Sequence, residues 1–367
     1  MNASLSPGAN ASVTRRILPK LIVSLLLGGL FAWLVARGGV PLIPKRADFA
    51  SLHWWTVPAY AASLAVTHFF RASRWRFLIA PIKRLPLREV VALNWIGFFA
   101  IFALPLRLGE LARPALTKAR AGISISVGLG TVAVERVIDG LVTSLCVAWA
   151  LVAIPRLDVT DKLAQALPFY GYAALTVFSG AFVALGVFLW KRDLAVRLVS
   201  KTVGIVSPKL ANFVSGKVAS VADGVRSIGS PRLLLGFSAE TLVYWSTNAF
   251  GMWLLGWGVG IPMTPGHAVA IMGILAIGIL LPAGPGLFGN FQLAISTALK
   301  LYFATNLVGT AGSVYIFLMY SVQAVLIVLA GVVPLYLMRI PFSSLLKVSV
   351  KETIPPPVPT AGTTDGD

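Results

Sequence analysis

Six charged residues in two short segments of this sequence could bind a charged ligand. The first segment, LPLRLGELARPAL, covers residues 104–116, and the second, TVAVERVIDGLVT, covers residues 131–143. In the second segment, polar residues recur every four positions, which on an α-helix places them along one face. The planar fork of arginine binds phosphate oxygens in pairs, and a carboxylate can position an arginine or bind an amine. The six residues are Arg107, Glu110, Arg113, Glu135, Arg136 and Asp139.

The same six residues could instead neutralise one another. Three arginines and three carboxylates balance without a ligand, and their ion pairs would hold the first segment against the helix predicted for the second. An ionisable residue costs about 2.5–3.5 kcal/mol at the centre of a membrane span, so such residues are expected to have a partner or a function. A ligand site and a structural network are compatible, and the sequence leaves both open.

A third segment, LPAGPGLFGNFQ at residues 281–292, carries no charge but has the composition of a helix break. Proline removes backbone donors, and glycine allows a tight turn. A helix that begins near Gly289 would direct free N–H groups towards an anion, with Asn290 and Gln292 as neutral donors. A packed helix break without a ligand is the alternative. The residues predicted to form this turn and the turn of the first segment are Pro105, Gly109, Pro282, Pro285, Gly286 and Gly289.

These segments lie in a chain with the composition of an integral membrane protein. Of its 367 residues, 57% are hydrophobic and 12% are charged, whereas about a quarter are charged in typical soluble proteins. The mean hydropathy is +0.83, and several apolar runs approach or exceed the roughly 18 residues of a membrane span. The net charge of +18 comes from basic loops between these runs, which is typical of membrane topology rather than of nucleic-acid binding. One cysteine and three well-separated histidines predict no metal site, and no cofactor is expected.

The distribution of basic residues predicts how the apolar runs cross the membrane. If the segment near 90–122 enters from the cytoplasm and returns, and the segment near 268–303 does the same from outside, 24 Lys and Arg residues are cytoplasmic and 6 are external. If the run at 90–106 and each later run crossed in turn, 14 Lys and Arg residues would be cytoplasmic and 16 external. That arrangement lacks the excess of cytoplasmic basic residues that orients membrane proteins. We therefore predict an all-α polytopic protein with two opposed re-entrant helical hairpins, about six full transmembrane helices and both termini in the cytoplasm. The six are expected near residues 18–36, 54–70, 123–154, 168–190, 233–259 and 313–338.

The membrane domain is predicted to cover residues 15–340. Within it, residues 208–228 have apolar side chains at helical spacing and basic side chains on other faces, which predicts a cytoplasmic amphipathic helix. The two ends of the chain, 1–14 and 341–367, are expected to be disordered tails because they contain polar and proline-rich stretches.

Four motifs together resemble those of one known family. They are LP-x-R-x-GE-x-x-R at 104–113, T-x-x-x-ER-x-x-D at 131–139, P-x-x-PG-x-x-G at 282–289 and the arginine-rich RASRWRFL at 71–78. Their types and order resemble the lysylphosphatidylglycerol synthase transmembrane-region family, also described as flippase-like domain proteins. The resemblance implies a multi-pass protein of the bacterial cytoplasmic membrane. The best-understood relatives move aminoacylated phosphatidylglycerol from the cytoplasmic to the outer leaflet.

Two features separate this sequence from those relatives. About 27 residues follow the last predicted span, too few for the cytosolic domain that attaches the amino acid in the relatives, so we expect no aminoacyltransferase activity. Gln292 stands where the family usually has a glutamate. If that glutamate binds a cationic headgroup in the relatives, an anionic or glycosylated lipid is at least as good a candidate here as a lysylated one.

The leading hypothesis is a lipid translocator whose headgroup site contains the six charged residues, Asn290 and Gln292. Its partners would be membrane lipids, among them anionic phospholipid, and a separate lipid-modifying enzyme, and no nucleic acid is expected. Two alternatives stay open. The carboxylates could serve an intramembrane enzyme that acts on lipid-linked substrates, or the protein could be a membrane scaffold for lipid or polysaccharide synthesis. The lack of a nucleophile–histidine pair in the sequence favours a protein that is not an enzyme.

Overall fold

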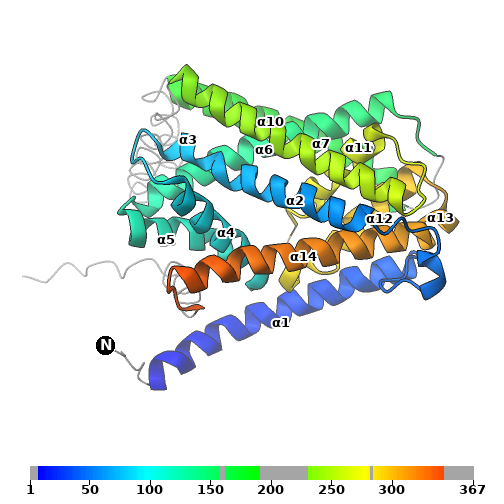
Figure 1. Ribbon diagram of the computed structural model, residues 1–367, viewed down its shortest axis with the longest axis horizontal. Helices are drawn as coiled ribbons and strands as arrows, with labels where there is room; N and C mark the ends of the chain where they lie inside the picture. The colour runs from blue at the N-terminus through cyan, green and yellow to red at the C-terminus, as the bar shows by residue number, and fades with distance from the viewer. Residues whose placement is uncertain (1–6, 158–161, 191–229, 282–283, 343–367) are drawn as a thin grey trace, which may run out of the picture.

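The computed structural model describes residues 7–157, 162–190, 230–281 and 284–342, and this part of the chain contains helices and no β-strand. The longer helices run along a common direction and form an elongated bundle (Figure 1). The α-helices are α1 (Pro7–Arg37), α2 (Thr56–Ser73), α3 (Trp75–Ile79), α4 (Leu87–Ala103), α5 (Ala112–Ala121), α6 (Ile125–Ala153), α7 (Lys162–Trp190), α10 (Pro231–Gly258), α11 (Pro265–Gly278), α12 (Asn290–Tyr302), α13 (Thr305–Gly309) and α14 (Ala311–Leu337). The described 3-10 helices are η1 (Arg46–Phe49), η2 (Pro105–Leu111) and η4 (Pro285–Leu287).

Four described helices are long and apolar enough to cross a membrane, so the chain is a multi-pass α-helical membrane protein. The four segments are Leu18–Arg37, Ile125–Ala153, Lys162–Ala184 and Ala311–Leu337. The other two predicted spans correspond to α2 and α10, which are 18 and 28 residues long and pack against each other. Both contain charged residues, Arg71 in α2 and Glu240 in α10, which lower their mean hydropathy. The full set of six crossings therefore stays a prediction.

The first predicted hairpin consists of a helix, a break and a second helix. α4 ends at Ala103, and Leu104 is extended, as is typical of a residue before proline. Pro105 begins η2, and Gly109 within η2 lies directly against the backbone of α4, where a Cβ atom would collide with the carbonyl group of Ala100. α5 then packs against α4 and α6. The helix break agrees with the predicted turn, whereas its entry into the membrane from the cytoplasm stays a prediction.

The second predicted hairpin also consists of two helices and a break. α11 and α12 pack against each other, and between them Gly286 and Gly289 have φ angles of +71° and +83°, which favour glycine. A Cβ atom at Gly289 would collide with the carbonyl oxygen of Gly28, so α1 contacts the break directly. Helices α11, α12 and α13 occupy the opposite end of the bundle from α3, α4 and α5 (Figure 1).

The N-terminal end of the described chain differs from its prediction. Helix α1 begins at Pro7, so residues 7–14, which we expected in a disordered tail, form its first turns. Proline is well suited to the first position of a helix, and the helix continues through Gly8 and Pro19 into the apolar run. The predicted amphipathic helix at 208–228, the turn residue Pro282 and the chain from residue 343 onwards lie outside the described residues.

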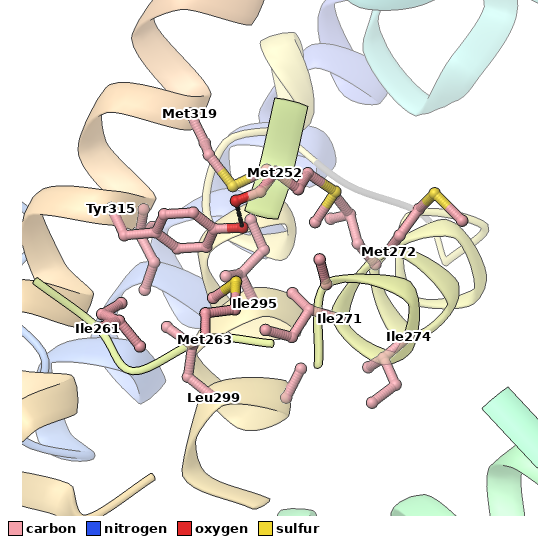
Figure 2. Close-up of a cluster of buried hydrophobic side chains, with 14 of the residues drawn as sticks. Met252, Ile261, Met263, Ile271, Met272, Ile274, Ile295, Leu299, Tyr315 and Met319 are labelled. Atoms are coloured by element: carbon pink, nitrogen blue, oxygen red, sulfur yellow. Dashed lines mark hydrogen bonds between the residues drawn. The ribbon is translucent and has the colours of Figure 1, made fainter. Parts of the chain in front are cut away.

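An apolar core fills the space between α2, α10, α11, α12 and α14. In Figure 2, Met252 of α10, Met272 of α11 and Met319 of α14 project into the same cluster. Tyr315 donates a hydrogen bond of 3.2 Å to the backbone oxygen of Met252, which satisfies its buried hydroxyl group. Met272 and Met319 also line a cavity, so the core forms part of the wall of that cavity.

Candidate ligand-binding cavity

A partly open cavity of about 330 Å³ is lined by residues of eight helices and of both helix breaks, η2 and η4. Pockets that bind small molecules have volumes of about 300–1,000 Å³. Four charged residues lie on its wall, and they also line a small adjoining hollow, which shows that they form one charged region. Most of the remaining wall is aromatic or aliphatic, including Phe98, Phe102 and Phe291. The four charged residues are Arg71, Glu110, Arg136 and Asp139.

A larger hollow, of about 610 Å³, lies near the ends of α6 and α7. Its lining contains a single charged residue, Arg156, and none of the residues predicted to form a site. Because a binding site needs several convergent polar groups, the smaller charged cavity is the better candidate.

The pair formed by Arg113 and Glu135 connects the first helix break to α6. Arg113 lies in α5 and donates to the carboxylate of Glu135 and to the side-chain oxygen of Asn94 in α4. Its guanidinium group also lies 5.2 Å from the ring centroid of Trp75. Arg113 and Glu135 are 7% and 6% exposed, and they line the small adjoining hollow but not the cavity. This arrangement supports the structural interpretation for these two residues.

The pair formed by Arg136 and Glu110 is looser and more accessible. The nearest nitrogen and oxygen atoms are 3.8 Å apart, the side chains are 30% and 37% exposed, and both line the cavity. A ligand could therefore contact Arg136 without separating a buried ion pair. The backbone of Arg107 belongs to η2, but its side chain lies outside the described residues.

Asp139 has a partner that the two-segment prediction did not include. Arg74, at the end of α2, donates hydrogen bonds of 2.8 and 2.6 Å to the two carboxylate oxygens of Asp139. Arg74 is 1% exposed and also donates to the hydroxyl group of Thr241. The charges of the six residues therefore do not neutralise one another in three internal pairs, because an arginine from the segment 71–78 forms the ion pair with Asp139.

Arg71, one turn before Arg74, lies on the cavity wall, and sequence reasoning did not assign it to the site. Its guanidinium group lies 4.5 Å from the ring centroid of Phe98 and 5.9 Å from that of Tyr244. Among the described residues, no carboxylate forms a salt bridge with it. The arginine-rich segment 71–78 was the signal that could have identified it.

A separate ion pair lies in the N-terminal half of α10, where this helix contacts α3. Glu240 accepts hydrogen bonds from Ser73 and from the guanidinium group of Arg76. Neither Glu240 nor Arg76 lines the cavity. Tyr244 and Asn248, one and two helical turns after Glu240 in α10, do lie on the cavity wall.

Asn290 and Gln292 hold the second helix break together and do not line the cavity. The amide nitrogen of Asn290 donates to the backbone oxygen of Gly278 at 2.9 Å. The side-chain oxygen of Gln292 accepts a hydrogen bond of 2.8 Å from the backbone nitrogen of Gly289. These hydrogen bonds give both residues a structural role, because they satisfy backbone groups that the break leaves unpaired, and their contact with a headgroup stays a prediction.

The carboxylates that an intramembrane enzyme could use are those of the two charged segments, and all three line the small adjoining hollow. Glu110, Glu135 and Asp139 each face a different arginine. Among the residues that the structure describes, no group of three or more His, Cys, Asp or Glu is placed to hold a metal ion.

Comparison with known proteins agrees with the motifs in the sequence. The family model described as lysylphosphatidylglycerol synthase TM region matches residues 17–331. No curated protein and no solved structure matches the chain. The matched range contains both helix breaks, every residue of the charged region and the cavity. The chain therefore belongs to the lysylphosphatidylglycerol synthase TM region family, a family of membrane domains.

Proposed function

We propose that the protein moves a phospholipid or a lipid-linked headgroup between the leaflets of the cytoplasmic membrane. The observation that carries this proposal is the cavity, whose wall combines one charged region with mostly apolar surroundings and includes both helix breaks. A lipid has the matching chemistry, because a charged headgroup is joined to acyl chains that can stay in the bilayer.

The cost of placing charge inside a membrane domain supports a function for this cavity. Ionisable residues within membrane helices are expensive and usually mark a pathway for a substrate, an ion or a proton. Arg136 and Glu110 are accessible from the cavity and loosely paired, unlike the buried pair that anchors α5. A headgroup could therefore contact this pair without breaking the buried one.

The two helix breaks suggest how access could alternate. Non-helical backbone at membrane depth is tolerated where it is packed in protein or lines a cavity, and paired broken helices often mark transport sites. The first break contributes Glu110 to the cavity, and the second contributes Leu287. In the proposed cycle, movement near the first break opens the cavity to the cytoplasmic leaflet, and movement near the second opens it to the outer leaflet.

A leaflet assay in liposomes tests the proposal. The purified protein is reconstituted in phosphatidylcholine liposomes that contain a trace of fluorescent phosphatidylglycerol, phosphatidylethanolamine or phosphatidylcholine. A membrane-impermeant quencher then reports how fast the inner-leaflet label reaches the outer leaflet. We expect faster movement than in empty liposomes for at least one of the three lipids. Rates that equal those in empty liposomes for every lipid would contradict the proposal.

A matched pair of substitutions in α14 identifies the route. Gln323 lines the cavity, whereas Val325, two residues further on, is 58% exposed on the outside of the bundle. We expect Gln323→Trp to slow lipid movement because the larger side chain fills the cavity. Val325→Trp should leave the rate unchanged, and equal loss in both variants would argue against the cavity as the route.

A further inference from the structure

We infer that the cavity selects a phosphodiester headgroup that carries one negative charge and hydroxyl groups, and that it disfavours headgroups that carry an amine. The inference rests on the proposed function, because it concerns which lipid enters the same cavity. It follows from the charges and the hydrogen-bonding groups of the cavity wall.

The four charged residues of the wall, counted together with Arg74 behind it, carry one positive charge in excess. Asp139 is neutralised by two hydrogen bonds from Arg74, which lies behind the wall, and Glu110 faces Arg136. Arg71 remains, and among the described residues it lies beside aromatic rings and forms no salt bridge with a carboxylate. A monoanionic ligand would complete the balance.

The geometry of Arg71 suits a phosphodiester. A guanidinium group that rests on aromatic rings is held in place by cation–π attraction, while its N–H groups at the edge remain available. Its planar fork can then donate two parallel hydrogen bonds to the two unesterified oxygens of a phosphodiester. Phe98 and Tyr244 provide such rings, with Phe98 the nearer at 4.5 Å from its centroid.

The neutral polar groups on the wall suit hydroxyl groups. Asn248 and Gln323 line the cavity, and within the described chain neither side chain has a hydrogen-bond partner. A primary amide both donates and accepts, as a hydroxyl group does. The ring nitrogens Nε2 of His68 and Nε1 of Trp245, on two further lining residues, are buried without partners among the described residues, so an oxygen inserted beside them would satisfy them.

An amine would find a poorer site. Both oxygens of Asp139 are already occupied by Arg74, and an ammonium group near Glu110 would have to compete with Arg136 and would be repelled by Arg71. Gln292, at the position where the family usually has a glutamate, is neutral and turned towards the backbone of Gly289. The described cavity wall therefore offers no carboxylate that is left for an ammonium group.

Binding of short-chain lipids to the purified protein tests this selectivity. The probes are dioctanoyl phosphatidylglycerol, dioctanoyl phosphatidylethanolamine, a lysine ester of the former, and inorganic phosphate alone. Affinity is measured from the shift in thermal unfolding in micelles as each probe is titrated. We expect the phosphatidylglycerol to bind at least about tenfold more tightly than either amine-bearing lipid, because losing one charge-assisted interaction costs about that factor or more. Equal or tighter binding of an amine-bearing lipid would overturn the inference.

Substitution of Arg71 locates the selectivity. Arg71→Gln should lower the affinity for the phosphatidylglycerol about tenfold to a hundredfold, and Arg71→Lys should lower it less, because the charge is kept and the fork is lost. Arg37→Gln is the matched control, since Arg37 also lies over an aromatic ring, that of Trp33, but is exposed and away from the cavity. Unchanged affinity in both Arg71 variants, each with a normal unfolding temperature without ligand, would contradict the role of Arg71.

The same measurements show whether the ligand is a lipid or a free anion. They also distinguish failure of the inference from failure of the proposed function. Stabilisation by inorganic phosphate equal to that by phosphatidylglycerol would overturn the assignment to a lipid. Lipid movement in the leaflet assay without selective binding would contradict the inference and leave the proposed function standing. Selective binding without movement of any lipid would support the inference and contradict translocation.

Discussion

The first helix break, between α4 and α5, and the second, between α11 and α12, are stabilised by different forces. At the first break, Arg113 forms a buried ion pair with Glu135 in the neighbouring helix α6. At the second, Gly289 lies in direct contact with Gly28, and the described residues around the turn form no ion pair. The difference shows that charge is concentrated near one break, where some of it is structural and some faces the cavity, while the other break depends on close backbone packing.

The largest expected effect tests the ion pair at the first break. Arg113→Met leaves Glu135 buried without its partner, and removing one member of a buried pair typically costs about 3–5 kcal/mol. We expect a loss of this size in the free energy of unfolding, measured by denaturation in micelles. Arg136→Gln is the control, because Arg136 is 30% exposed and its pair with Glu110 is loose, so the loss should stay below about 1 kcal/mol. Equal losses in the two variants would show that the buried pair is not special.

The next effect tests the packing at the second break. Gly289→Ala puts a Cβ atom at a φ of +83°, which alone costs about 1–3 kcal/mol, and that atom would also collide with α1. We expect a lower unfolding temperature and a displaced α1. Gly29→Ala, in α1 beside the contact, should not destabilise the protein, because a Cβ atom there meets nothing within 4 Å. A destabilised Gly29→Ala variant would show that α1 itself is sensitive to substitution, not the break.

A third substitution separates the structural charge from the charge that faces the cavity. Arg136→Gln removes a partly exposed cation whose nearest carboxylate oxygen is 3.8 Å away, so its cost in stability should be below about 1 kcal/mol. We expect it to slow lipid movement in the leaflet assay severalfold, because a cavity cation is lost. Loss of stability without loss of lipid movement would assign Arg136 to the fold instead.

The smallest expected effect on lipid binding concerns Gln292. Its side-chain oxygen accepts a hydrogen bond from the backbone nitrogen of Gly289, and a carboxylate oxygen in Gln292→Glu could accept the same bond. The side chain is 4% exposed, so the added charge should lower the stability by about 1–3 kcal/mol even though this bond is kept. The affinities for the anionic and the amine-bearing lipid should stay unchanged. A gain in affinity for the amine-bearing lipid would show that this residue reaches the headgroup.

Local patterns predicted the helices and the two breaks because these depend on neighbouring residues. The four apolar spans, the break after Leu104 and the turn at Gly286 and Gly289 follow from hydropathy, proline and glycine. The beginning of α1 at Pro7 was missed because polar residues near a terminus do not themselves exclude a helix. The charged residues were recognised, but spacing alone could not show which of them form buried ion pairs and which line the cavity.

The sequence by itself determined that this is an α-helical membrane protein with charge near its first break, because composition and hydropathy follow from the residues alone. Only the tertiary structure decided that Asp139 pairs with Arg74, 65 residues away, that Arg71 lies on the cavity wall, and that Asn290 and Gln292 support the break. The physical reason is that an ion pair forms between the side chains that packing brings together. Spacing along one helix indicates on which face a side chain lies, but the residue that pairs with it belongs to another part of the chain.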